Sequence, residues 1–232
     1  MPEKDAIILA SRSPRRRELL SSLGVTFAVC PADIDEASLP SQSPTELAKQ
    51  LSYTKAQVIA QAAPHALIIA ADTLVILEGH VLGKPRSPQE AIEMLKALRG
   101  RPHLVMTGLT LLQATQGRKS VQVARTPVFM RAYTDEEIIS YVNTGDPLDK
   151  AGGYAIQNPS FAPVECIEGC YANVVGLPLC HLYRVLSAWG FDARHPLEAC
   201  PWPLEHGACP WADAILSGTG DPCIPKKEEH VP

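Results

Sequence analysis

The sequence predicts an α/β fold with one central mixed sheet and flanking helices. Short apolar runs of strand length alternate with segments whose apolar residues recur at helical spacing, and no internal repeat interrupts this order. The 232 residues suit one large or two small domains, and 46% apolar with 20% charged residues is an ordinary globular mixture. These values exclude a mostly disordered chain, a collagen and a coiled-coil rod.

The first elements are predicted from short apolar runs and from helical spacing. Residues 6–10 form an apolar run of strand length, and the helix after them places Leu19, Leu20 and Leu23 on one face before it stops at Gly24. The next elements in chain order are a helix at about 44–62, a buried strand at 67–71, a hairpin-like segment at 73–82 and a helix at about 88–99.

The rest of the chain is predicted to contain two long β-rich runs, 103–115 and 120–133, joined by a turn. A helix follows from residue 134 to just before Gly145, and a last helix covers about 178–189. Beyond about residue 194, repeated prolines punctuate a segment with little periodicity. We therefore expect one domain over residues 1–194 and a tail over 195–232 that is poorly ordered or lies over the surface.

Charge and targeting signals narrow the function classes. A net charge of −4 argues against non-specific nucleic-acid binding, which needs a broad basic face, so any anion must be bound by a local cluster. The N-terminal apolar run is too short for a signal peptide, and the longest apolar run, 66–71, is too short for a membrane span. We expect a cytoplasmic protein that does not bind membranes.

Three predicted helices begin with Ser-Pro, and one of them breaks the usual charge pattern. The helices that begin at Pro44 and Pro88 have serine as N-cap and glutamate at the third position, which is a capping box. The helix that begins at Pro14 has three arginines instead, and each cation at the positive end of a helix is unfavourable by roughly 0.3–1 kcal/mol.

A bound polyanion would compensate for these arginines. The Ser11 and Ser13 hydroxyls, the free N–H groups and the guanidinium groups of Arg15 and Arg16 together form a predicted anion site. The segment follows a predicted strand directly, and open α/β sheets bind ligands at such junctions. The alternative is an exposed basic turn without function.

Two further candidates, an acid and a lysine, accompany the third strand. Asp72 follows the run 67–71 with Thr73 beside it, and a carboxylate on a rigid element is able to act as general base or metal ligand. The alternative for Asp72 is an acid that caps a turn. Lys84 follows the hairpin, but Pro85 comes next and the spacing of the preceding glycines is wrong, so this segment is not a phosphate-binding P-loop.

Lys55 lies within the apolar arc of its predicted helix, so it needs an anionic partner or a ligand unless it reaches out to the surface. Asp33, Asp35 and Glu36 form an acidic cluster of the kind that Mg²⁺ prefers, with a solvated loop as the alternative. The segment 150–157 has two adjacent glycines that permit close backbone approach, and Gln157 carries an amide able to read a nucleobase edge.

The seven cysteines include no C-x-x-C pair. In the tail, Cys200, His206, Cys209 and Cys223 are possible zinc ligands, but their spacing fits no common zinc pattern. The alternative is a loose extension whose cysteines do nothing specific. Taken together, the candidate residues suggest a triphosphate held by basic groups, with a metal and a carboxylate that activate water.

The chain from about Ile7 to Trp189 resembles the Maf (septum-formation-protein-like) nucleoside triphosphate pyrophosphatases. The resemblance rests on several motifs in the family's order: Ser11-Arg-Ser-Pro-Arg-Arg16, Ile34-Asp-Glu36, Thr54-Lys-Ala56, Ala71-Asp-Thr73, Lys84-Pro85, Asp149-Lys-Ala-Gly-Gly-Tyr-Ala-Ile-Gln157 and Asn173-Val-Val-Gly-Leu-Pro178. It implies an α/β fold with two lobes around a cleft, similar to inosine triphosphate pyrophosphatases, and often a homodimer.

The resemblance also implies hydrolysis of a nucleoside triphosphate to the monophosphate and pyrophosphate, with Mg²⁺ or Mn²⁺. It assigns the proton acceptor to Asp72 and base selectivity to Arg15, Thr73 and Gln157. The Ser-Pro-Arg-Arg version is similar to the branch that acts on dTTP and UTP. Asn158 departs from the family, which usually has glycine there, and this change lies beside the expected base-reading edge.

These observations lead to a mechanistic hypothesis in which water attacks the α-phosphorus in line, because pyrophosphate leaves intact. Asp72 takes the proton, Glu36 helps to bind the metal, and Arg16, Lys55 and Lys84 stabilise charge on the phosphates. The alternative function is a non-catalytic, nucleotide-binding regulator of cell division and septum formation.

Overall fold

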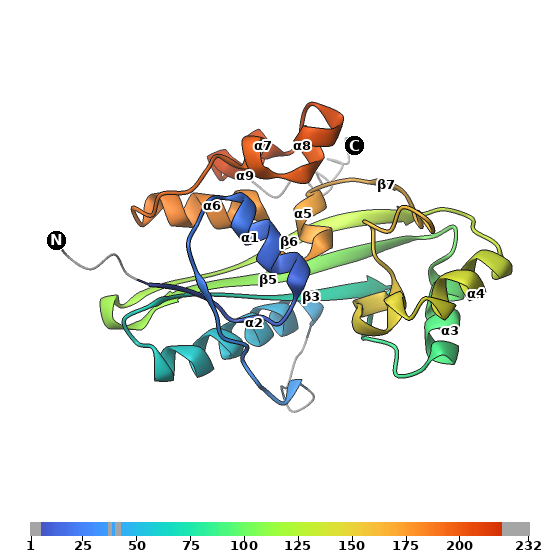
Figure 1. Cartoon of the computed structure of the whole chain (residues 1–232), viewed down its shortest axis with the longest axis horizontal. Coiled ribbons are helices and arrows are strands. Elements are labelled where there is room, and N and C mark those ends of the chain that lie inside the picture. The colour runs from blue at the N-terminus through green and yellow to red at the C-terminus, as the bar shows by residue number, and fades with distance from the viewer. Residues whose placement is uncertain (1–5, 37–38, 40–42, 220–232) are drawn as a thin grey trace, which may run out of the picture.

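A seven-stranded mixed sheet organises the chain, in the strand order β2-β1-β3-β5-β6-β7 with β4 paired to β3 (Figure 1). The computed structural model describes residues 6–36, 39 and 43–219. The strands are β1 Ile7–Leu9, β2 Ala28–Val29, β3 Leu67–Leu77, β4 His80–Leu82, β5 Pro102–Gln113, β6 Arg118–Met130 and β7 Val164–Ile167. Parallel pairs join β1 to β2 and to β3, and the other pairs are antiparallel, which confirms the predicted mixed sheet.

Helices cover both faces of the sheet, as predicted (Figure 1). They are α1 Pro14–Ser22, α2 Pro44–Ala62, α3 Pro88–Leu98, α4 Asp135–Asn143, α5 Tyr171–Val175, α6 Leu179–Ala188, α7 Pro196–Ala199, α8 Pro201–His206 and α9 Ala212–Ser217. Two 3₁₀ turns, η3 Asp146–Asp149 and η4 Ala151–Gly153, follow α4. None of the helices in the described ranges is long and apolar enough to cross a membrane.

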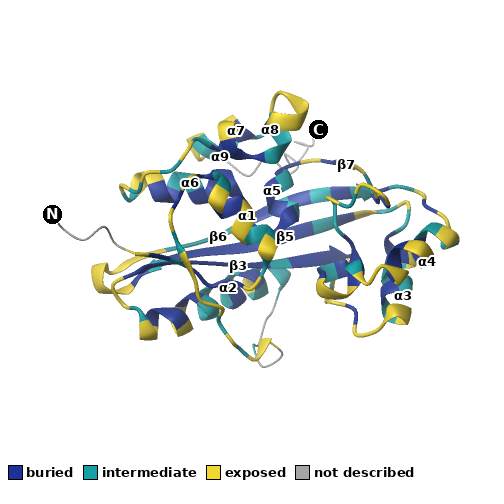
Figure 2. Ribbon diagram, viewed as in Figure 1, coloured by how far each residue is buried: buried dark blue, intermediate teal, exposed yellow. Residues whose placement is uncertain are grey.

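The alternating faces of β3 divide the core into separate clusters. Residues 68, 70, 74 and 76 pack against α2 on one face. On the other face, Leu67, Ile69 and Ala71 pack with α1, α5 and α6, whereas Val75 and Leu77 pack with α3 and α4. The helices on this second face therefore form two lobes, one at each end of β3, and the buried core runs along the sheet beneath them (Figure 2).

The prediction of a strand end before Asp72 is wrong. β3 continues without a break through Asp72 and Thr73, which pair with Gly108 and Thr107 of β5. The polar pair interrupts the apolar run, but the backbone stays in the antiparallel ladder because β5 runs alongside on its other edge. The side chain of Asp72 is thus fixed by a central strand and not by a turn.

Serine caps form at all three Ser-Pro helix starts, since the Ser13, Ser43 and Ser87 side chains accept hydrogen bonds from the third helical N–H. The two expected capping boxes are only half formed. The Glu90 carboxylate accepts from the N–H of Arg86, and the Glu46 carboxylate pairs with Lys49. The complete box lies at the start of α4, between Thr134 and Glu137.

The expectation of a poorly ordered tail is not met over residues 196–217. This segment forms α7, α8 and α9, and Ala199, Cys200, Ala212 and Ile215 are buried in the same core cluster as α1 and α6. Three tryptophans and other apolar residues pack in this cluster. The burial of their apolar surface stabilises the helices more than the helix-breaking tendency of the prolines opposes them. Cys223 lies outside the described residues, so the four residues weighed as zinc ligands, whose spacing fits no common zinc pattern, are not all described.

Candidate functional site

An interruption in the strand pairing along one edge of β3 creates the candidate site. β1 pairs with Leu67–Ile69 and β4 pairs with Val75–Leu77, both on the edge opposite β5. Between these two strands, no described strand pairs with residues 70–74 on that edge. Side chains from both faces of the sheet are therefore able to reach a common space at this gap.

A cavity of about 640 Å³ opens at the gap, between the two lobes. This volume falls within the range of ligand pockets in proteins, about 300–1,000 Å³. Its lining does not include Asp35 of the acidic cluster, but it includes ten of the residues predicted from the sequence: Ser11, Ser13, Arg15, Arg16, Glu36, Lys55, Asp72, Thr73, Lys84 and Gln157. The structure thus brings all ten residues to one cavity, although they come from segments far apart in the sequence.

Asp72 lies on the face of β3 that α2 covers, and Lys55 of α2 meets it there. Helix and sheet approach closely because Gly108 lies opposite Asp72, and a Cβ at Gly108 would fall 1.9 Å from the Ala48 carbonyl oxygen of α2. Two helical turns after Ala48, Lys55 Nζ contacts Asp72 Oδ1 and donates to Glu36 Oε1 at 2.7 Å. The predicted anionic partner of Lys55 is therefore a pair of carboxylates.

Glu36 and Asp72 both contact Lys55 Nζ, so their carboxylates lie close to each other. They are therefore the residues to consider as ligands of a divalent metal. The side chain of Asp72 is 11% exposed and that of Glu36 is 58% exposed, so the pair opens to the cavity on one side. Within the described ranges, no group of three or more His, Cys, Asp or Glu side chains is arranged to hold a metal. Two carboxylates completed by phosphate oxygens match the way proteins hold Mg²⁺ together with a nucleotide.

Thr73 projects to the opposite face of β3, where it helps to clamp Arg16. Arg16 donates from Nε to the Gly176 carbonyl at 2.8 Å, from Nη2 to Thr73 Oγ1 at 3.0 Å and from Nη1 to Ser11 Oγ at 3.4 Å. The clamp needs glycine at 176, whose φ is 122° and whose Cβ would lie 3.3 Å from both Arg16 Nε and Thr73 Oγ1.

This clamp limits what Arg16 can offer a ligand. Three of its five N–H donors bind protein atoms, so two remain for a phosphate. Burial lowers the pKa of Arg16, and the negative charge of Asp72 opposes that change. The Arg16 cation and the Asp72 carboxylate therefore interact electrostatically. The sequence predicted Arg16 as a phosphate ligand and did not indicate its bonds to Thr73 and Gly176.

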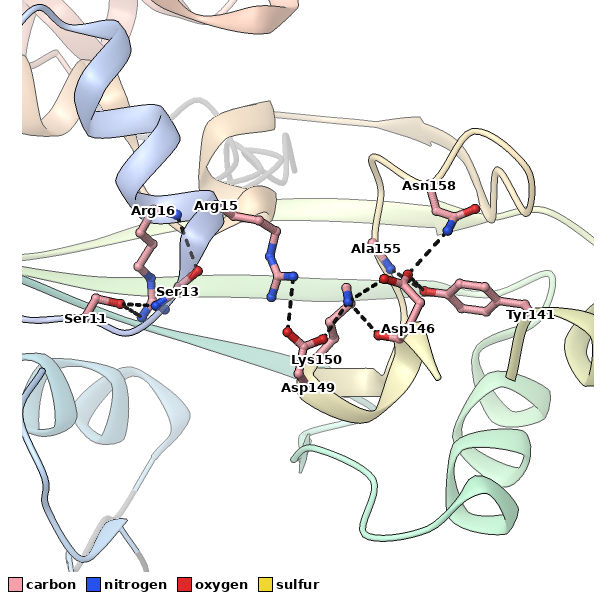
Figure 3. A network of polar contacts seen from close by, with 10 residues as sticks. All are labelled: Ser11, Ser13, Arg15, Arg16, Tyr141, Asp146, Asp149, Lys150, Ala155 and Asn158. Carbon is pink, nitrogen blue, oxygen red and sulfur yellow. Dashed lines mark hydrogen bonds and ion pairs between the residues drawn. The ribbon is translucent and has the colours of Figure 1, made fainter. Parts of the chain in front are cut away.

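Arg15 crosses the cavity to the other lobe. Its Nη1 lies 3.5 Å from Asp149 Oδ2, at the end of η3 (Figure 3). Lys84 and Gln157 are exposed on the cavity wall of that same lobe. The arginines of α1 thus have different partners, since Arg16 is held by its own lobe and Arg15 by the opposite one.

A second, smaller cavity lies between α5, α6 and the tail helices. It is lined by apolar side chains and four cysteines, with no charged residue among them: Cys170, Tyr171, Ala172, Leu179, Cys180, Pro196, Leu197, Cys200, Trp202, Pro203, Cys209, Ala212 and Ile215. Burial raises the pKa of Cys180 to about 12 and of Cys200 to about 11, so these thiols stay protonated at neutral pH. A polyanion therefore fits the first cavity and not this one.

The α/β sheet and the cavity define a class of protein: one whose two lobes enclose a cavity lined by basic side chains beside a buried carboxylate, as a polyphosphorylated ligand requires. The chain belongs to the Maf-like protein family, whose model matches residues 6–189. The resemblance found in the sequence motifs is thereby confirmed.

Similar proteins include three named "dTTP/UTP pyrophosphatase". The protein of Carboxydothermus hydrogenoformans is 49% identical over 185 residues, 80% of this chain and 99% of that protein. The protein of Syntrophus aciditrophicus is 46% identical over 80% of this chain and 91% of its own length. The protein of Thermomicrobium roseum is 46% identical over 213 residues, 91% of this chain and 96% of that protein.

Among solved structures, a HAM1 protein from Coxiella burnetii gives a TM-score of 0.40 at 15% identity, covering 67% of this chain and 88% of that chain. A nucleoside-triphosphatase, dITP/XTP pyrophosphatase, from Mycobacterium abscessus gives 0.38 at 14% identity, covering 55% and 75%.

Proposed function

We propose that this chain hydrolyses a nucleoside triphosphate, dTTP or UTP, to the monophosphate and pyrophosphate. The relatives that match most of the chain carry that activity in their names. The observation that carries the proposal is the shared cavity, because it places the arginine-bearing start of α1 beside Asp72 and Lys55. A non-catalytic binding protein would not need a buried acid held by a lysine at the same place.

In this proposal, the triphosphate lies along the start of α1, within reach of the Ser11 and Ser13 hydroxyls and of Lys84. Asp72 accepts the proton of the water that attacks the α-phosphorus, and pyrophosphate leaves intact. Lys55 supplies positive charge beside Asp72 from a position fixed by two carboxylates. Arg16 adds its two remaining donors.

Glu36 and Asp72 are the residues that would hold Mg²⁺ or Mn²⁺. The bound metal would neutralise phosphate charge as it develops in the reaction. The partners that we propose are the nucleoside triphosphate substrate and a second copy of the chain, which would form a homodimer. We also propose a cytoplasmic location. The net charge of −4 supports the expectation that nucleic acid is not a partner.

Release of pyrophosphate tests the proposal. The purified chain is assayed with each common nucleoside triphosphate in the presence of Mg²⁺ or Mn²⁺. Pyrophosphate formed fastest from dTTP and UTP supports the proposal, whereas tight nucleotide binding without pyrophosphate release would support the alternative of a nucleotide-binding regulator.

The variant Asp72→Asn tests the catalytic role of the carboxylate. Loss of a general base typically lowers the rate by a factor of about 10²–10⁴, so kcat of this variant should be lower than that of wild type by about the same factor. Binding of a non-hydrolysable UTP analogue, measured by calorimetry, should survive. Asp213→Asn, an exposed acid on α9 outside the cavity, is the matched control. Wild-type turnover in Asp72→Asn would remove this residue from the chemistry.

A further inference from the structure

A continuous set of polar contacts links the two lobes around Lys150, and we call it the Lys150 network (Figure 3). Lys150 is 7% exposed, and its Nζ donates to the Asp146 carbonyl at 2.5 Å, to Asp146 Oδ1 at 2.9 Å and to Asp149 Oδ1 at 2.6 Å. An ammonium group has three protons, and all three are used. Lys150 is therefore a positioning residue, with no donor left for a ligand.

The network leaves one oxygen of Asp149 available to the cavity. Lys150 holds Oδ1, while Oδ2 lies 3.5 Å from Arg15 Nη1, and the Asp149 side chain is 61% exposed. Burial raises the pKa of Asp149, but the hydrogen bond and charge of Lys150 together with the charge of Arg15 outweigh that effect, and the pKa is lowered overall. Asp149 is thus an ionised acceptor that lies beside the donors of Arg15.

The other end of the network fixes the segment that contains Gln157. Asp146 Oδ2 accepts from the Tyr141 hydroxyl at 2.7 Å and from Asn158 Nδ2 at 3.3 Å. The Tyr141 oxygen in turn accepts from the Ala155 N–H at 3.2 Å. The residues on both sides of Gln157 are thus held, Ala155 through its backbone and Asn158 through its side chain, and Arg15, Asp149 and Gln157 all line the cavity.

The donor of Arg15 and the acceptor of Asp149 distinguish bases by the order in which a base held at a fixed position presents its acceptor and its donor. Uracil and thymine present a carbonyl oxygen next to the N3–H, so a guanidinium is able to donate to the oxygen while a carboxylate accepts from N3–H. Cytosine held in the same position presents its amino group to the guanidinium and its N3 lone pair to the carboxylate, so donor faces donor and acceptor faces acceptor. A buried or charged group left without a partner makes such rejection strong.

We propose that Asp149 is a specificity-determining residue that accepts a hydrogen bond from the base N–H while Arg15 donates to the adjacent base carbonyl, and that this pair thereby disfavours cytosine. This inference rests on the proposed function. Guanine presents the same pair of groups, so Asp149 selects a base by its edge and not by its size. Asp149 also marks the base end of the cavity, because its negative charge repels the phosphates.

The test compares kcat/KM for UTP and CTP, two bases of equal size, in wild type, Asp149→Ala and Asp149→Asn. Wild type should prefer UTP. The ratio of UTP to CTP should fall by about tenfold or more in Asp149→Ala, as expected for the loss of one hydrogen bond to a charged acceptor. In Asp149→Asn the amide is able to turn its NH₂ toward cytosine N3, so CTP hydrolysis should rise.

Controls separate this inference from general damage. Asp213→Asn removes the same charge outside the cavity and should keep the ratio, and melting temperatures show that each variant folds. An equal loss of kcat/KM for UTP and CTP in both Asp149 variants would overturn the inference while the proposed function stands. A wild type that releases no pyrophosphate would overturn the proposed function. In that case, calorimetry measures the affinities of wild type and Asp149→Ala for UMP and for CMP. If the ratio of the two affinities is the same in both proteins, the inference is wrong.

Discussion

Lys55 is a charged residue that the molecule keeps 12% exposed by giving it two carboxylate partners. A buried ammonium group is costly unless it is paired, so Glu36 and Asp72 explain why this position tolerates lysine. The lysine also fixes the Asp72 side chain at the cavity. We infer that its removal affects the reaction more than an ordinary surface salt bridge would.

We predict that Lys55→Met lowers kcat by about 10², the typical cost of losing one preorganised electrostatic partner. Glu36 and Asp72 would then repel each other across the cavity. Lys49→Met on the same helix is the control, since the Lys49 side chain is 40% exposed and forms its ion pair with Glu46. Pyrophosphate release measures both variants, and similar rates for the two would contradict this role of Lys55.

Sequence reasoning named ten residues that line the cavity but few of the contacts they make. Lys55 was identified because an amphipathic helix predicts which side each residue occupies. The pairing of Arg15 with Asp149 was not predicted, because local periodicity carries no information about which distant segments meet. Lys150 lies in the motif of residues 149–157, but the sequence of that motif does not indicate which three oxygens accept from its ammonium group.

At the scale of elements, the contact between α2 and β5 positions Lys55. Gly108 permits this contact, and Ser52 of α2 adds a hydrogen bond of 2.9 Å to Thr110 of β5. An added methyl group at residue 108 would collide with the backbone of α2, which cannot turn aside as a side chain can.

We predict that Gly108→Ala destabilises the fold by about 1–3 kcal/mol and lowers turnover as α2 and Lys55 shift. Chemical denaturation measures the loss of unfolding free energy, and the pyrophosphate assay measures the loss of rate. Gly83→Ala is the control for stability, because a Cβ there meets no atom within 4 Å and its φ is not positive. Equal stabilities of the two variants would refute the proposed close packing.

The start of α1 shows how an element accommodates unfavourable charge. The sequence predicted that three arginines at the positive end of a helix require compensation. Arg15 is compensated by Asp149 of the other lobe, and Arg16 by the Gly176 carbonyl and the hydroxyls of Ser11 and Thr73. Both sets of partners come from outside the helix, which is why the sequence indicated the conflict but not its resolution.

The tail illustrates the opposite case. Its prolines argue against regular structure, yet the tail forms the short helices α7, α8 and α9. Pro196 begins α7 and Pro201 begins α8, and proline is tolerated in the first turn of a helix. Tertiary packing on α6 then stabilises helices too short to form alone. A local reading of the sequence could not predict that contact.

For the whole molecule, alternation of strands and helices predicted the fold class and most element bounds. The strand order could not be obtained in this way, since β1 pairs with β3 across sixty residues and β4 shares that edge. The cavity depends on this order, because it lies between β1 and β4, where β3 has no neighbouring strand among the described residues.

Two buried histidines make stability of the whole fold depend on pH. Burial lowers the pKa of His103 and of His181 to about 4 from 6.5. Both are neutral in the folded and unfolded chain above pH 6.5. As pH falls from 6.5 toward 4, only the unfolded chain takes up these protons, so unfolding free energy should drop by about 1.4 kcal/mol per pH unit for each histidine.

The variant His103→Asn should therefore lose part of the dependence of unfolding free energy on pH between 4 and 6.5. The exposed His65→Gln should keep the whole dependence. Urea denaturation at several pH values measures the slope. Identical slopes in His103→Asn and wild type would show that His103 is already protonated in the folded protein.

Residues 70–74 of β3, with which no described strand pairs on the edge opposite β5, also affect the solubility of the protein at high concentration. A bare strand edge invites another chain to add a strand, and proteins commonly prevent this with charged side chains at the edge. Here Lys55, Asp72 and Arg16 stand at such an edge. The charges that suit the cavity to a polyanion also discourage aggregation, so neutralising several of them together should cost solubility as well as activity.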